Sequence, residues 1–393
     1  MDAHVVEWLN LTVRWIHFIT GIAWIGSSFY FNWLENALNK QGLREGIAGN
    51  LWAIHGGGFY YLEKYKVAPK VIPKTLHWFK YEAYFTWISG FALLIIVYYY
   101  NAGVYMVDSG SSTPPALAVL LGIGSLIVGW FIYDTMCKTP LIKKPVLFTL
   151  VGFLIVVAIS YYLTQMLSSR AAYLHVGAML GTCMAANVFL VIIPSQKKLV
   201  ESAKQGKEPD AVQGRKAFLR SLHNNYMTLP VLFIMISNHF PSTYGNEFNW
   251  AVLAGLFVVG TGVRHYYNLL GKGQNAFWIL PAAVVGMIGL AMVTKPPPAH
   301  QLAGGRQIEF SEAQALISKR CVSCHSANPT DKVFVVAPKG VMFDTPDQIV
   351  QHQDKIFIQA VTTKVMPLGN TTFITEEERE IIGAWIQQGA IIE

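Results

Sequence analysis

Eight apolar runs, each long enough to cross a lipid bilayer, occupy the first 295 residues and constrain the fold more than any other feature. A spanning helix needs about 20 mostly apolar residues. The runs lie at 8–34, 82–101, 115–136, 146–167, 171–194, 222–239, 249–270 and 275–294. Only 13% of the residues are charged, against about one quarter in a soluble domain. The sequence therefore predicts an all-α protein with an eight-span membrane domain over residues 1–295.

The distribution of Lys and Arg predicts the orientation of this domain. The alternate polar segments that begin with 35–81 hold 18 of these residues, whereas the opposite side holds only Arg170 and Lys295. Short basic loops stay in the cytoplasm. The protein is thus predicted to lie in a bacterial inner membrane, with both ends of the chain facing the periplasm. The first run lacks a basic segment before it, so we expect a retained anchor and no cleaved signal peptide.

The apolar bias ends at a Pro-rich linker, 296–304, and the remaining residues 305–393 carry a haem-attachment pattern. In CVSCH, Cys321 and Cys324 are placed to form two thioethers to a haem, and His325 to ligate its iron. Met366, in VMPLGN, supplies a thioether as sixth ligand, which raises the reduction potential. The alternatives are a chance match or a CxxC metal site, although no second cysteine pair follows to complete a zinc site.

Together with the acidic start and the AWIQQGA end of its last predicted helix, this pattern makes residues 305–393 resemble a small class I cytochrome c domain. The resemblance implies one covalent haem c with His325 and Met366 as axial ligands. Haem c is attached in the periplasm, which is where the predicted topology places this domain.

Ionisable residues at bilayer depth mark functional sites by default. One predicted group lies in the outer half of the membrane domain, where His17, His175 and His239 are candidate ligands of a b-type haem, near Arg14 and Arg170. The alternative for each histidine is an interfacial position or a bond to a backbone carbonyl.

A second group lies toward the cytoplasm and contains His223, Arg264 and His265. The cytoplasmic segment LWAIHGGGFYY, around His55, is predicted to be either a re-entrant segment at a substrate mouth or a loop on the lipid headgroups. No nucleotide-binding or hydrolase motif occurs, and no basic stripe with interleaved aromatic residues suggests nucleic acid.

RWIHFITGIAWIGSSFYF, SLHNNYMTLPVLFIMISNHFP and the fused haem-attachment segment together resemble the bacterial membrane-bound urate oxidases, or urate hydroxylases. The resemblance implies oxidation of urate to 5-hydroxyisourate. It implies that the electrons pass to the fused cytochrome c, then to a soluble cytochrome c or a terminal oxidase of the respiratory chain. Hydrogen peroxide is not an expected product.

Urate is a planar monoanion at neutral pH, so its site needs a cation and amide partners. Arg264, close in sequence to His265 and expected near His223, is the preferred candidate, with Arg14 as the alternative. We expect the inner group to bind substrate and the outer group to bind haem. A quinol:cytochrome c-type electron-transfer protein and a non-enzymatic carrier with a tethered cytochrome remain the two other candidate functions.

Overall fold

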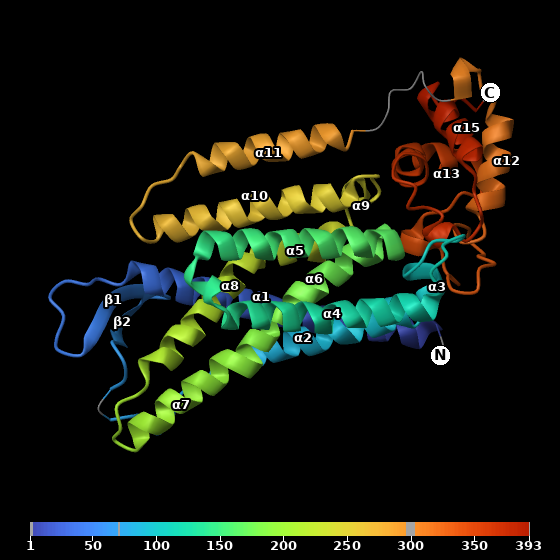
Figure 1. Cartoon of the computed structure of the whole chain (residues 1–393). Coiled ribbons are helices and arrows are strands. Elements are labelled where there is room, and N and C mark those ends of the chain that lie inside the picture. The colour runs from blue at the N-terminus through green and yellow to red at the C-terminus, as the bar shows by residue number, and fades with distance from the viewer. Residues whose placement is uncertain (1–2, 70, 296–302, 393) are drawn as a thin grey trace.

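The computed structural model describes residues 3–69, 71–295 and 303–392. The chain is mostly helical, as predicted. Residues 3–295 form the helical part, in which the long helices run roughly along one axis (Figure 1). A two-stranded sheet lies at one end of these helices, and residues 303–392, the C-terminal unit, lie at the other end (Figure 1). The predicted linker falls largely on residues 296–302, which lie outside the described residues.

Each predicted apolar run of the first 295 residues folds into helix. The helical part contains α1 (Ala3–Ala37), α2 (Tyr81–Leu93) with the π-helical turn η1 (Leu94–Tyr99), α3 (Ala102–Tyr105), α4 (Pro115–Lys138), the 3-10 turn η2 (Pro140–Lys143), α5 (Pro145–Met166), α6 (Ser169–Ala186) with the π-helical turn η3 (Asn187–Ile192), α7 (Ile193–Lys204), α8 (Ala211–Ser237), α9 (Pro241–Tyr244), α10 (Asn249–Leu270) and α11 (Ile279–Val293).

Within the described residues, four helices are long and apolar enough to cross a membrane. They are Tyr81–Tyr99, Pro115–Lys138, Pro145–Met166 and Ser169–Lys204. The apolar helix α11 is shorter, at 15 residues. Helices α1, α8 and α10 are long, but they carry the Arg, His and Asn residues that lower their apolar content. Helices α1, α8 and α10 are therefore less apolar than the four spanning helices because they contain these Arg, His and Asn side chains.

The prediction of an all-α chain is wrong for one segment, because β1 (Ile47–His55) and β2 (Gly58–Tyr65) form an antiparallel hairpin. Gly56 and Gly57 form its turn, both at positive φ, where glycine has no steric penalty. Aromatic and β-branched residues on either side favour strand. The region is therefore a regular hairpin, and its position at a substrate mouth or on the lipid headgroups stays a prediction.

Helix α6 forms the centre of the helical part. Ala171, Ala172 and Val176 on it are completely buried. Its neighbours approach closely, because a Cβ on Gly122 of α4 would lie 2.5 Å from the His175 ring, and Gly177 of α6 itself lies against Ile234 of α8. Small residues at such contacts let helices pack backbone to backbone.

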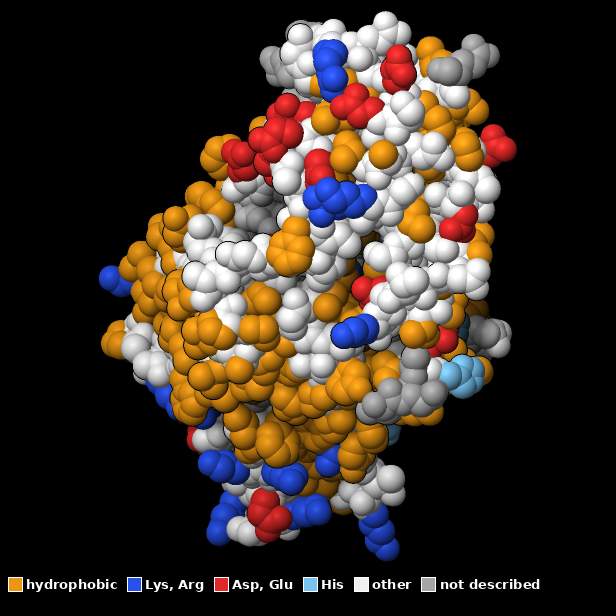
Figure 2. Space-filling model, turned by 90° about the vertical axis from the view of Figure 1, so that its right-hand side faces the viewer, with side chains coloured by type: hydrophobic (Ala, Val, Ile, Leu, Met, Phe, Trp, Pro, Cys, Tyr) orange, Lys and Arg blue, Asp and Glu red, His pale blue; other side chains and the backbone are white. Residues whose placement is uncertain are grey.

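Charge is distributed unevenly along the long axis. Residues 35–81, 137–145 and 195–221 carry most of the Lys and Arg of the helical part, and these segments lie at the end away from the C-terminal unit (Figure 1). Figure 2, seen from the end with the C-terminal unit, shows hydrophobic side chains over much of the helical part and Lys and Arg at the bottom of the view.

The C-terminal unit is a small helical fold with its own core. It contains α12 (Phe310–Arg320), the 3-10 turn η5 (Pro338–Gly340), α13 (Pro346–Gln351), α14 (Gln353–Ile356) with the π-helical turn η6 (Phe357–Thr362), the 3-10 turn η7 (Leu368–Asn370) and α15 (Glu376–Gln387). Phe310 of α12 packs on Trp385 of α15, with ring centroids 5.4 Å apart. Ile317, Ile349 and Ile382 are fully buried in the same core.

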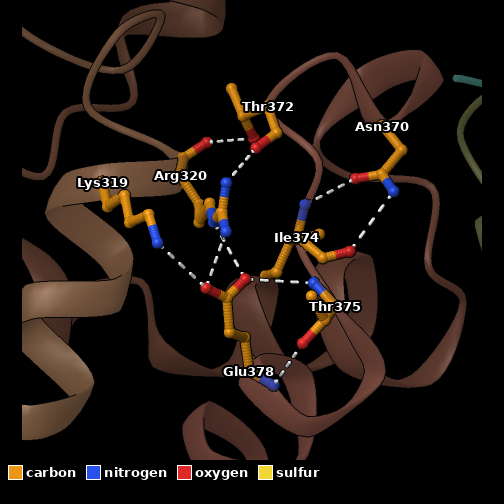
Figure 3. A network of polar contacts seen from close by, with 7 residues as sticks. All are labelled: Lys319, Arg320, Asn370, Thr372, Ile374, Thr375 and Glu378. Carbon is orange, nitrogen blue, oxygen red and sulfur yellow. Dashed lines mark hydrogen bonds and ion pairs between the residues drawn. The ribbon is translucent and has the colours of Figure 1, made fainter.

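A polar network fixes the end of α12 to the start of α15 (Figure 3). Arg320 donates from Nε and Nη2 to the two carboxylate oxygens of Glu378, at 2.8 and 2.7 Å. Thr375 and Glu378 form a capping box at the start of α15, and Thr372 donates its hydroxyl to the Arg320 carbonyl. The bonds hold Cys321, the residue after Arg320, in a defined position.

Candidate functional site: an unpaired arginine at the basic end

A cluster of asparagines around Arg264 joins three helices near the basic end. Arg264 of α10 donates its Nε–H to Asn225 Oδ1 of α8 at 3.0 Å. Asn268, one turn further along α10, donates to the same oxygen at 2.9 Å. Asn32 of α1 in turn donates to Asn268 Oδ1 at 2.8 Å. The four side chains are linked, and the chain of bonds orients the Arg264 guanidinium.

Arg264 has no acidic partner among the residues that the structure describes. It is 8% exposed, and the Phe29 ring of α1 covers its guanidinium carbon at 4.2 Å. The amide nitrogen of Asn225, which is 2% exposed, has no hydrogen-bond partner in the described part of the chain. A buried donor without an acceptor costs about 1–3 kcal/mol, and an unpaired buried charge costs more. An anion that accepts from both groups would remove both costs.

His265 does not share this site directly. Its Nδ1 lies 2.7 Å from the Tyr226 hydroxyl, and its side chain is exposed. This bond crosses the same pair of helices, α8 and α10, as the bond between Arg264 and Asn225. Arg264 is turned toward Phe29 of α1, and His265 toward the outside of the helical part.

His223 belongs to a second polar network beside α4 and α6. The Tyr133 hydroxyl lies 2.9 Å from His223 Nδ1 and accepts a bond from Asn187 at 3.0 Å. Arg220 donates to Asn187 at 3.0 Å and to Asp134 at 2.6 Å. In contrast to Arg264, Arg220 has a carboxylate partner, so its charge is balanced inside the protein.

Sequence reasoning missed Arg220, which lies just before the apolar run 222–239, and Asn187, a single polar residue inside the run 171–194. The periodicity of α8 contained the signal, since Arg220, Asn224 and Thr228 recur every fourth residue on one helical face and all are buried.

The three histidines predicted to bind a b-type haem in the outer half of the membrane domain have different neighbours from one another. His17 Nδ1 lies 3.0 Å from the Thr86 carbonyl, so its Nε2 is the nitrogen left for another partner. His175 is completely buried, with Nδ1 2.7 Å from the Ala171 carbonyl and Nε2 3.0 Å from the Tyr99 hydroxyl. His239 is exposed just after α8. Ligation of a b-type haem by these histidines stays a prediction, and His175 offers a nitrogen only if its bond to Tyr99 breaks.

The two predicted arginines of the outer half also differ. Arg14 is exposed and donates to Asn10, one turn earlier on α1. Arg170 donates to Asn238 at 2.9 Å, and its guanidinium carbon lies 5.9 Å from the Tyr98 ring and 5.8 Å from the Tyr105 ring.

Cys321 and His325, two of the four predicted haem residues of the C-terminal unit, lie together just after α12. The Cys321 amide closes α12 by donating to Ile317, and the His325 amide donates to the Cys321 carbonyl at 2.9 Å. Nδ1 of His325 lies 2.9 Å from the Val341 carbonyl, a bond that leaves Nε2 for a ligand. Metal-binding histidines usually donate their second ring N–H to such a carbonyl.

The ionisation of His325 is consistent with the same use. Burial lowers the pKa of His325, so the ring is neutral at neutral pH, which is the form that binds metals. Burial raises the pKa of the Cys321 thiol to about 12. Cys321 and Met366 both pack against the core of the C-terminal unit. The donor set of two thiols, one imidazole and one thioether therefore fits a covalently bound haem.

A family model described as Urate oxidase N-terminal matches residues 3–295, about three quarters of the chain. The chain belongs to this family. The match contains the whole helical part, including Arg264 and Asn225, and it ends where the predicted linker begins. Neither the curated proteins nor the solved structures contain a match. Membership of the urate oxidase N-terminal family places the protein among urate-related oxidoreductases.

Proposed function

We propose that the protein oxidises urate at the Arg264–Asn225 cluster and passes the electrons to a haem c in the C-terminal unit. The observation that carries the proposal is the unpaired Arg264 guanidinium beside an Asn225 amide nitrogen that has no partner among the described residues. Family membership supplies the substrate class. The reaction converts urate and water to 5-hydroxyisourate, with release of two electrons and two protons.

The cluster suits a planar anion for three reasons. Arg264 supplies the positive charge, and Asn225 supplies an N–H donor that is already buried and oriented. The Phe29 ring lies over the guanidinium and provides an apolar wall. Hydrogen bonds that involve a charged group are about twice as strong as neutral ones. Urate would accept from both donors through its carbonyl oxygens.

In the C-terminal unit, Cys321 and Cys324 would hold the haem covalently, with His325 and Met366 at its axial positions. The haem, when bound, supplies a site that accepts one electron at a time. His325 is oriented for this role by the Val341 carbonyl. Arg379, 4% exposed, donates from Nη1 to the Met366 carbonyl at 2.7 Å and so holds the backbone of the second ligand.

We further propose that all eight apolar helices cross the inner membrane, with both ends of the chain in the periplasm. The basic segments lie at one end of the helical part and the C-terminal unit at the other, which is the arrangement that the positive-inside rule requires. A b-type haem bound by His17 is a further proposal, because its Nε2 is the ring nitrogen left for a ligand.

Anaerobic absorbance spectroscopy of the purified protein tests the function. Urate should reduce the c haem in the absence of oxygen. Reduction by a quinol and not by urate would instead support a quinol:cytochrome c-type protein, and reduction by neither would support a carrier. A pyridine haemochrome spectrum of the same sample counts c and b haems separately, and a spectrum with c haem alone would eliminate the proposed b-type site.

A further inference from the structure

The C-terminal unit touches the helical part through the loop that follows Met366. Gly369, at φ +60°, lies so close to α3 and the segment after it that a Cβ there would sit 2.8 Å from the Val104 carbonyl oxygen and 3.3 Å from that of Val107. The Ser109 amide donates to the Gly369 carbonyl at 2.6 Å. The two backbones are thus in direct contact, with no room for a side chain between them.

A second contact of the same kind lies beside α9. A Cβ on Gly245 would be 2.5 Å from the Thr363 carbonyl oxygen and 2.5 Å from its Cβ. Between the two glycine contacts, Val365 packs into the core of the helical part, although it precedes a predicted haem ligand in sequence. The side of the C-terminal unit that carries segment 363–369, which includes Met366, therefore faces the helical part.

An aromatic contact extends this interface. The Tyr105 ring lies 6.5 Å from the Phe334 ring of the C-terminal unit and 5.7 Å from the Tyr98 ring beneath it. The Arg170 guanidinium lies over both tyrosines. Among the described residues, apolar side chains and close backbone contacts, rather than surface ion pairs, make the contact between the two parts.

We propose that the C-terminal unit works as a permanently docked unit, and that electrons enter it from the membrane domain through the 104–109 and 366–370 segments. The inference rests on the proposed function for the origin of the electrons, whereas the docking stands on the geometry alone. Gly369 and Gly245 are positioning residues, because their lack of a side chain sets the separation of the two parts. The face opposite loop 366–370 is then free for the external electron acceptor.

Photo-crosslinking in native membranes tests the docking without any use of activity. Phe334 is replaced by p-benzoylphenylalanine, which keeps an aromatic ring at the contact with Tyr105. Ultraviolet light should link it to the peptide that contains residues 102–109, as mass spectrometry would identify. The same residue in place of Ile391, which is 61% exposed in the C-terminal unit, is the matched control and should give no link to the helical part.

The docking proposal predicts the same crosslinking yield for the oxidised and reduced protein and with or without urate. The proposal would be overturned by a crosslinking yield at Phe334 no higher than at Ile391, or by a yield that falls sharply during turnover. Either result would show that the C-terminal unit separates from the helical part. Failure of urate to reduce the haem would refute the proposed function, and the crosslink would still decide the docking.

Paired glycine substitutions test the positioning role. Asparagine tolerates positive φ, so Gly369→Asn isolates the steric contact from backbone strain. Gly340→Asn is the control, because Gly340 also has positive φ (+67°), but a Cβ added there would meet no atom of the described residues within 4 Å. We expect Gly369→Asn to slow urate-dependent haem reduction roughly tenfold or more, since small misplacements carry large rate penalties.

Three properties of Gly369→Asn should be unchanged: the KM for urate, the near-infrared sulfur-to-iron band and the rate of direct reduction by ascorbate. Unchanged values would distinguish slow electron transfer between the two parts from damage to the haem site. Gly340→Asn should keep the wild-type transfer rate. Equal rates in the two variants, with the sulfur band intact in both, would contradict the proposed entry route. If Gly369→Asn loses the sulfur band, Gly245→Ala provides the same comparison from a residue far from the haem ligands in sequence.

Discussion

Arg264 donates to the side-chain oxygen of Asn225 at 3.0 Å, while the nitrogen of the same Asn225 amide is buried without an acceptor in the described part of the chain. The amide oxygen of Asn225 thus holds the arginine, and the amide nitrogen is available to donate to a ligand. This arrangement differs from that of Arg220, whose charge Asp134 already balances at 2.6 Å. The difference tells which of the two buried arginines in the described helical part can take an external anion.

Asn225→Asp should weaken urate binding while it preserves the shape of the side chain. The new carboxylate would pair with Arg264 and would replace the free N–H donor by an acceptor. The KM for urate should rise roughly tenfold to 100-fold, the range expected for loss of a hydrogen bond to a charged group. Steady-state kinetics would measure this, with Arg264→Gln as the companion variant. Arg215→Gln, on the same helix α8, should leave the KM unchanged.

Met366→Ala should abolish the weak near-infrared sulfur-to-iron band and lower the reduction potential of the c haem, because a thioether ligand favours reduced iron. Met366 packs against the core of the C-terminal unit, and its carbonyl is held by Arg379. Met342→Ala is the control and should keep both properties. If Met342→Ala loses the band and Met366→Ala retains it, the axial ligand is misassigned.

Glu378→Gln should make the stability of the C-terminal unit less dependent on acid pH. The bond to Arg320 lowers the pKa of Glu378 below its usual 4.5. The bond therefore contributes fully above pH 4.5, and its contribution is lost as pH falls through the lower, folded-state value. The variant should lose about 1 kcal/mol at about pH 7 and less at about pH 3. Denaturant titration followed by haem absorbance would measure both; an equal loss at both pH values would mean that ionisation of Glu378 is irrelevant.

Reporter fusions should locate Gly110 and Asn246 in the periplasm and Gln205 in the cytoplasm. The reason is the excess of Lys and Arg in the segments that lie at the hairpin end. Alkaline phosphatase activity at the first two positions and none at the third is the expected result. The reverse pattern would place CVSCH in the cytoplasm, away from the machinery that attaches haem c.

Apolar length predicted where the helices lie, because hydrophobic runs of about 20 residues have few alternatives to helix. The positions of Cys321 and His325 at the end of α12 also follow from the motif, in which both thiols and the imidazole must lie on about one turn. The link from Arg264 to Asn225 was predictable in part, since both lie near the same end of neighbouring apolar runs.

The remaining features depend on how the helices rotate and pack, which local sequence does not determine. His265 is adjacent to Arg264 in sequence, but successive helical residues point about 100° apart, and it lies against Tyr226 on the outside. The hairpin had a local signal in Gly56 and Gly57, which a search for spans passes over. The contact of Gly369 with Val104 joins residues far apart in the chain and has no signature in either segment.

The concentration of lysine and arginine at the hairpin end has a consequence beyond orientation in the membrane. The Arg264 cluster lies near this end, where Asn36 of α1 contacts Gly271 after α10. A surface with an excess of one sign of charge enriches oppositely charged solutes around it, and added salt screens that enrichment beyond a Debye length of about 10 Å at about 0.1 M. An anionic substrate would thus be enriched in the solution next to this end of the protein, and its capture rate would fall as ionic strength rises.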